Sequence, residues 1–169
     1  MLFRLALLFL ASLAIPATAA ERHVHGAGKL NVAIEGDAVS IELSAPADDI
    51  VGFEHPAISP EDKATVAKAL AALKDGAGLF VFPAAAGCRL EDAKVESGLL
   101  AEAKPGTGDG HADFDADYRF RCAQPGKIDG IETKFFARFP KARELDVQAV
   151  TPKGQIKGEL TPKAARLKF

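Results

Sequence analysis

The chain has 169 residues, a formal net charge of −2 at pH 7 and two cysteines. Because the charge is close to neutral and no basic stripe runs along the sequence, a nucleic acid is not expected as a partner. The length is sufficient for one domain with a substantial hydrophobic core.

The first twenty residues have the pattern of a secretory signal peptide. Arg4 supplies a positive charge, residues 5–15 form an apolar run, and residues 16–20 offer small side chains for cleavage. The run is shorter than the roughly 20 residues that a membrane-spanning helix needs, so no stable membrane insertion is expected after cleavage. We therefore expect one exported, soluble domain over residues 21–169, in the periplasm if the host is a Gram-negative bacterium.

The N-terminal half of the mature chain predicts a hairpin and then a helix. Residues 30–34 and 39–43 alternate apolar and polar side chains about a Gly-Asp turn, which favours a β-hairpin with one buried face. Ser59 has the properties of an N-cap and Pro60 those of a first helical residue. The apolar run 79–82 is consistent with a buried strand or with the last turn of a helix.

The C-terminal half predicts a second hairpin, a second helix and further strands. The strictest alternation of apolar and charged side chains runs from Phe114 to Cys122 and predicts a strand. The other expected elements are a strand over 88–96, a helix over 128–139, strands over 144–150 and 155–160, and an edge strand over 167–169. Together they predict an α+β domain, in which antiparallel hairpins form a sheet and two helices pack on one side.

Cys88 and Cys122 are the two cysteines of the chain. In an exported protein such a pair is expected to form a structural disulfide, here joining the open ends of the second hairpin. The spacing fits neither a CxxC redox motif nor a zinc site with four thiolates.

Each histidine has a carboxylate or another histidine within two residues in the sequence. Imidazole is the commonest metal ligand at neutral pH, and an added carboxylate is normal for zinc. We expect one shared zinc(II) site with these ligands: His23, His25, His55 and His111, with Glu54 or Asp113 as a substitute or a supporting partner. The competing interpretation treats them as an N-terminal tail, a surface histidine and an acidic loop tip that bind no metal.

A copper(II) site is an alternative for the N-terminus. If the signal is cleaved after Ala20, the mature chain begins with Glu21-Arg22-His23. Its amine, two backbone amides and an imidazole would then form a square plane of nitrogens, which suits copper(II) or nickel(II). Cleavage after Ala19 would remove this arrangement.

Signatures of catalysis are missing from the sequence. It contains no HExxH, no G-x-S-x-G and no glycine-rich phosphate loop. A hydrolase that uses one zinc and Glu54 as its base has no further support, so we do not expect an enzyme.

Several short motifs follow one another in a fixed order along the mature chain. They are His23-Val24-His25-Gly26, Ser44-Ala45-Pro46, Val51-Gly52-Phe53-Glu54-His55, Cys88-Arg89-Leu90, His111-Ala112-Asp113, Tyr118-Arg119-Phe120-Arg121-Cys122, Phe135-Phe136-Ala137-Arg138-Phe139-Pro140, and Val147-Gln148 before Gly154-Gln155. With these motifs the chain resembles a bacterial family of small exported proteins, the zinc-regulated, zinc-uptake-associated periplasmic proteins.

The resemblance implies a protein that captures or buffers zinc(II) in the periplasm and assists a zinc ABC importer or its solute-binding protein. Many members carry a long insertion rich in histidine and acidic residues just before the position of His111, where this chain has only residues 104–110. We therefore expect a single folded site rather than a flexible segment that binds several zinc ions. The alternative from another class is a non-metal interaction module of the cell envelope.

Overall fold

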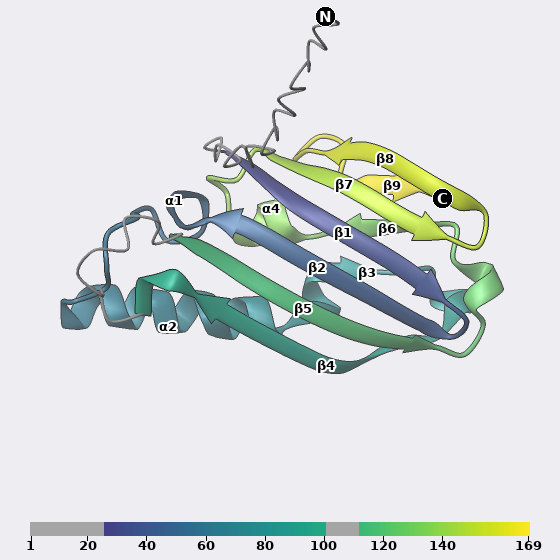
Figure 1. The fold of residues 1–169 in the computed structure, drawn as a ribbon, viewed down its shortest axis with the longest axis horizontal. Helices are drawn as coiled ribbons and strands as arrows, with labels where there is room; N and C mark the ends of the chain where they lie inside the picture. Colours follow the sequence, from purple (N-terminus) through teal and green to yellow (C-terminus); the bar gives the residue numbers. More distant parts are fainter. Residues whose placement is uncertain (1–25, 101–111) are drawn as a thin grey trace, which may run out of the picture.

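A six-stranded sheet is the largest element of the protein, whose computed structural model describes residues 26–100 and 112–169 (Figure 1). Its strands, in the order in which they pair, are β4 (Cys88–Ser97), β5 (Asp113–Cys122), β2 (Ala38–Pro46), β1 (Ala27–Glu35), β7 (Glu144–Thr151) and β8 (Gly154–Leu160). The antiparallel pairs expected from the sequence, β1–β2, β4–β5 and β7–β8, are present. The sheet is nevertheless mixed, because β1 and β7 run parallel.

Helices and a small second sheet cover one face of the large sheet (Figure 1). The small sheet has the order β3 (Phe80–Val81), β6 (Gly130–Thr133) and β9 (Arg166–Lys168). The helices are α1 (Ala47–Ile50), α2 (Pro60–Lys74), α3 (Gly76–Leu79) and α4 (Phe135–Arg138), and the single 3₁₀ turns are η1 (Ala84–Ala86), η2 (Gly98–Leu100) and η3 (Pro125–Lys127). The other face of the large sheet carries exposed polar side chains.

Alternation along β5 explains why the sheet has one covered face and one open face. Successive side chains of a strand point to opposite faces. The apolar side chains of β5 are buried, and those between them, Asp115, Asp117 and Arg119, are exposed. On the covered face the Tyr118 hydroxyl donates to the carbonyl oxygen of Leu73 at 2.8 Å, which fastens α2 to the sheet.

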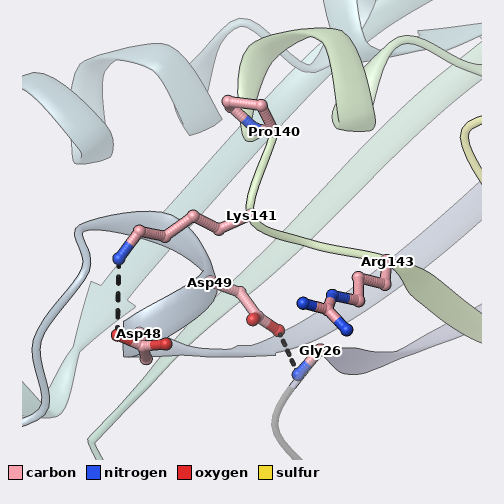
Figure 2. A pocket seen from close by; sticks show the side chains of 6 residues that line it. All are labelled: Gly26, Asp48, Asp49, Pro140, Lys141 and Arg143. Carbon is pink, nitrogen blue, oxygen red and sulfur yellow. Dashed lines mark hydrogen bonds and ion pairs between the residues drawn. The ribbon is translucent and has the colours of Figure 1, made fainter.

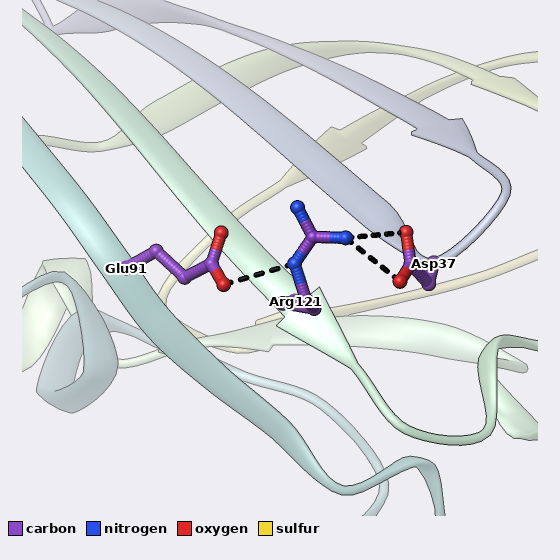
Figure 3. Close-up of polar contacts among 3 residues, drawn as sticks. All are labelled: Asp37, Glu91 and Arg121. Atoms are coloured by element: carbon purple, nitrogen blue, oxygen red, sulfur yellow. Dashed lines mark hydrogen bonds and ion pairs between the residues drawn. The ribbon is translucent and has the colours of Figure 1, made fainter.

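A disulfide and an ion-pair network tie the end of the sheet that holds the β1–β2 turn. We call it the disulfide end and define it by Asp37, Cys88, Glu91, Arg121 and Cys122. The Cys88–Cys122 bond joins β4 to β5, as the sequence predicts. Arg121 Nη1 donates to both carboxylate oxygens of Asp37 at 2.7 Å, and its Nε donates to Glu91 Oε1 at 2.9 Å (Figure 3).

The helix expected after Ser59 is confirmed as α2. Ser59 Oγ accepts the backbone N–H of Asp62 at 3.0 Å, the contact that defines an N-cap. The run 79–82 is divided between the end of α3 at Leu79 and the start of β3 at Phe80.

The helix expected over residues 128–139 is wrong, because β6 and α4 occupy most of this segment. At Gly130 the backbone of β9 passes so close that a Cβ would overlap the carbonyl oxygen of Leu167. At the end of β6, the Thr133 hydroxyl donates to Leu79 O and accepts the N–H of Phe135, both at 3.1 Å. The broad expectation of sheets with helices holds, but the described chain is mostly β, and two helices packed on one side are not confirmed.

The expected signal peptide, residues 1–20, lies outside the described residues, together with residues 21–25 and 101–111. Within the described ranges, no helix is long and apolar enough to cross a membrane.

Candidate metal site

The end of the sheet opposite the disulfide end is where β1, β5 and β7 begin and β2 ends (Figure 1). The strand register brings these ends together, since Pro46 is paired with Asp113 and Ala27 with Glu144. We call this end the histidine edge and define it by Gly26, Pro46, Ala112 and Glu144. Two of these four, Gly26 and Ala112, directly follow a histidine in the sequence.

Gly26, the residue after His25, is hydrogen-bonded through both its backbone groups. Its N–H donates to Asp49 Oδ2 at 3.1 Å. Its carbonyl oxygen accepts the backbone N–H groups of Arg143 at 3.1 Å and Glu144 at 2.9 Å. Asp49 belongs to α1 and is only 4% exposed, so a buried carboxylate and the start of β7 together fix the start of β1.

Ala112, the residue after His111, is fastened to the first residue of α1. Its carbonyl oxygen accepts the backbone N–H of Ala47 at 2.7 Å. The next residue, Asp113, is 9% exposed and stands opposite Pro46 in the β2–β5 register. The short helix α1 therefore holds both chain segments that continue toward a histidine, one at Gly26 and one at Ala112.

His55 lies in the loop between α1 and α2 and is exposed. Its ring stacks on Phe53, with ring centroids 4.6 Å apart and an angle of 14° between the ring planes. Its Nδ1 lies 3.1 Å from the carbonyl oxygen of Pro56, a hydrogen bond when Nδ1 carries the proton. In that tautomer the proton is on Nδ1, so the lone pair of Nε2 is available to a metal. The hydrogen bond through Nδ1 would also orient the ring as a ligand.

The loop that carries His55 is fastened to η2 by a backbone hydrogen bond, from Ala57 N–H to Leu99 O at 3.0 Å. η2 is the last described element before residue 101, and the chain is described again at Ala112. The residues on both sides of the segment that contains His111 are therefore attached to the region between β2 and α2, where His55 lies.

Three of the six expected ligands are described: Glu54, His55 and Asp113. His23, His25 and His111 lie outside the described residues, as does the Glu21-Arg22-His23 copper motif. Among the described residues, no group of three or more His, Cys, Asp or Glu side chains is arranged to hold a metal ion. The shared zinc site thus remains a prediction, since the described part of the chain does not form one by itself.

A cavity of about 490 Å³ adjoins the histidine edge at Gly26 (Figure 2). Its other lining residues are Asp48, Asp49, Pro140, Lys141 and Arg143. The sequence gives no signal for these residues, because nothing in the local pattern indicates that the segment after α4 returns to α1. That proximity follows from the parallel pairing of β1 with β7.

Carboxylates also gather on the open face beside the histidine edge. Glu144 has a pKa above its ordinary value, because it loses solvation and lies beside the carboxylates of Glu159 and Asp146. Asp146 and Glu159 are directly opposite each other in the β7–β8 register. A negative surface of this kind attracts cations without binding them at specific positions.

A family model described as ZrgA family zinc uptake protein matches residues 22–169 of the chain. The chain belongs to the ZrgA family of zinc uptake proteins. This result confirms the family resemblance predicted from the ordered motifs. No curated protein matches the chain. Membership in the ZrgA family connects the chain with zinc uptake, a process that fits an extracytoplasmic protein.

Proposed function

We propose that this member of the ZrgA family is a periplasmic protein that captures zinc(II) at the histidine edge and buffers it for, or passes it to, a zinc importer. The observation that carries the proposal is the common position of Gly26, Ala112 and the loop of His55 at one end of the sheet. The partner in this proposal is a zinc ABC importer or its solute-binding protein, and the chain is not an enzyme.

Chain geometry supports a shared site. Consecutive Cα atoms are about 3.8 Å apart, so His25 and His111 each lie one peptide unit from the histidine edge. His23 is three residues from Gly26, a reach of about 11 Å at most. These short connections in the sequence allow the two N-terminal histidines and His111 to share a metal with His55.

The proposed ligands suit zinc that must be released again. Four imidazoles fill a tetrahedral site, whereas three imidazoles and one water leave a position through which the metal exchanges. Glu54 and Asp113 are the oxygen donors that are available as substitutes or supporting partners. An exposed position for His55 agrees with exchange rather than with permanent structural binding.

The decisive experiment is a calorimetric titration of the chelator-treated mature chain with zinc(II). We expect stoichiometric binding, and we expect His55→Ala to weaken it at least about 10-fold, or about 1.4 kcal/mol. The melting temperature of the metal-free protein should change little, because the stack on Phe53 and the contact with Pro56 O are made by an exposed loop side chain. Ile58→Ala is the matched control, since Ile58 lies in the same loop, is 78% exposed and cannot bind zinc.

Single alanine replacements of the other three histidines distinguish one site from several. A shared site predicts that each replacement weakens the same binding event. Separate sites predict that each replacement lowers the number of zinc ions bound and leaves the affinity of the others unchanged. If the wild-type chain takes up no zinc at neutral pH, the non-metal interaction module becomes the better proposal.

Copper(II) is tested in the same protein. If the purified mature chain begins at Glu21, copper should produce the visible band of a square-planar nitrogen site, and His23→Ala should remove it. A chain that begins at Ala20 or shows no such band would exclude this alternative.

A further inference from the structure

The cavity beside the histidine edge contains charges of both signs that the zinc proposal does not use (Figure 2). Two carboxylates, Asp48 and Asp49, come from α1. Two cations, Lys141 and Arg143, come from the segment between α4 and β7. They are separated by one residue, which suits side chains on the same side of an extended segment.

Arg143 is the cation that is ready to bind a ligand. Within the described part of the chain, its guanidinium makes no ion pair or side-chain hydrogen bond. Figure 2 shows it directed toward Asp49 and Gly26. A Cβ at Gly26 would lie 3.4 Å from Arg143 Cδ, so the Arg143 side chain packs against Gly26 on the side where another residue would have its side chain. A guanidinium has a planar fork of donors that matches a carboxylate.

Asp48 and Lys141 form a pair that a ligand can replace. Lys141 Nζ lies 3.6 Å from Asp48 Oδ1, and the two side chains are 58% and 41% exposed. Exposed pairs at such a distance contribute little to stability. A ligand that offers its own ammonium to Asp48 and its own carboxylate to the cations therefore loses little by separating them.

We propose that this cavity binds a free α-amino acid as its zwitterion, with the carboxylate on Arg143 and Lys141 and the ammonium on Asp48. An α-amino acid carries both charges on one carbon, so it complements a cavity lined with both signs. A simple carboxylate would face Asp48 and Asp49 without compensation, and a simple amine would face the two cations. The volume of about 490 Å³ lies in the range of small-molecule sites.

The test uses the metal-free mature chain, so its outcome does not depend on the zinc proposal. Calorimetric titrations with glycine, L-alanine, L-glutamate, L-lysine and L-histidine are compared with titrations with acetate and methylammonium. We expect saturable binding of at least one amino acid at one site per chain. Acetate and methylammonium should each bind at least 10-fold more weakly than that amino acid.

Two variants locate the site. Arg143→Gln and Asp48→Asn should each weaken amino acid binding at least 10-fold, because each removes the partner of one ligand charge. Arg89→Gln is the matched control, since Arg89 is exposed on β4 at the far end of the sheet, and it should not change binding. The proposal is overturned by no saturable binding of any of the five amino acids, by acetate binding equally well, or by an unchanged affinity in Arg143→Gln.

Discussion

The two ends of the six-stranded sheet are held together in different ways. At the disulfide end, a covalent bond and Arg121, paired with Asp37 and Glu91, join β4, β5 and the β1–β2 turn. At the histidine edge, the ties include hydrogen bonds with α1, from Gly26 to Asp49 and from Ala47 to Ala112, and two backbone hydrogen bonds to the carbonyl oxygen of Gly26. One end therefore stabilises the fold with a covalent bond and paired charges, while the other has hydrogen bonds and an exposed His55 in a neighbouring loop.

If zinc binds at the histidine edge as proposed, stability and metal binding are located at opposite ends of the same strands. Long strands such as β5 connect the two ends, so the disulfide end is able to stabilise the sheet without contributing a ligand. The following changes test this separation, in order of decreasing expected effect on the free energy of unfolding.

Removing the disulfide should have the largest effect. Cys88→Ser with Cys122→Ser opens a covalent loop with a sequence separation of 34 residues, and the loss should be about 2–4 kcal/mol of unfolding free energy. Denaturant unfolding monitored by circular dichroism measures it. Zinc affinity of the variant that remains folded should stay within about 3-fold of the wild type. A loss of zinc affinity equal to that of His55→Ala would show that the two ends are not independent.

Asp49→Ala should have the second-largest effect on the free energy of unfolding. It changes the histidine edge without removing an expected ligand. The N–H of Gly26 loses its buried acceptor, at a cost of about 1–3 kcal/mol of unfolding free energy. Zinc affinity should also fall, since Gly26, the residue after His25, is then held only through its carbonyl oxygen. Unfolding and zinc titration measure the two effects.

Asp49→Asn and Asp48→Ala are the controls for that experiment. Asparagine keeps an oxygen that accepts the Gly26 N–H, so Asp49→Asn should retain most of the zinc affinity. Asp48 is half-buried and 41% of its side chain is exposed, so its replacement should cost less than about 1 kcal/mol. If Asp49→Ala binds zinc as tightly as the wild type, the hydrogen bond to Gly26 has no role in positioning the ligands.

The sequence predicts those parts of the fold whose signals are local. In β5 the apolar and charged residues alternate so strictly that the expected strand, Phe114 to Cys122, differs from the observed one by one residue. Ser59 marks the start of α2 for the same reason, because an N-cap acts within three residues. The expected helix over 128–139 is wrong because its apolar residues fit a helical period, whereas the close approach of β9 at Gly130 requires a strand.

The sequence offers candidate ligands for the site but gives no signal for the residues around it. A histidine with a neighbouring carboxylate is visible in the sequence. Asp49, Gly26 and Arg143 have no such signal, because their contact depends on the parallel pairing of β1 with β7 and on the return of the chain through α1. Such non-local contacts follow from the topology of the whole sheet, which no short window of residues specifies.

Arg121→Gln tests the ionic part of the disulfide end and should cost about 1 kcal/mol or less. The partners Asp37 and Glu91 are 56% and 37% exposed, so solvent screens both interactions. The cost should shrink in 1 M salt, where the Debye length falls to about 3 Å. Melting temperatures at low and high salt measure it, with Lys157→Gln on β8 as the control for net charge. An effect that does not change with salt would indicate a packing role for Arg121 instead.

Glu144→Gln should have the smallest effect on the free energy of unfolding, and it should stabilise the protein where the other replacements destabilise it. The folded state raises the pKa of Glu144, through lost solvation and the carboxylates of Glu159 and Asp146, so it holds the proton more tightly than the unfolded chain does. Ionisation above the folded pKa therefore lowers stability. The glutamine variant should melt at a higher temperature than the wild type near neutral pH. This gain should fade as the pH drops through the raised pKa and vanish below the ordinary value of about 4.3.

Melting temperatures of the wild type and Glu144→Gln between about pH 3 and pH 7 test this expectation, with Glu35→Gln at the other end of β1 as the control for overall charge. A gain of equal size at every pH would mean that side-chain volume, not charge, is responsible. The expected result would complete the contrast between the two ends. The disulfide end pairs its carboxylates with Arg121, whereas the histidine edge retains carboxylates that repel one another, at the end where zinc is proposed to bind.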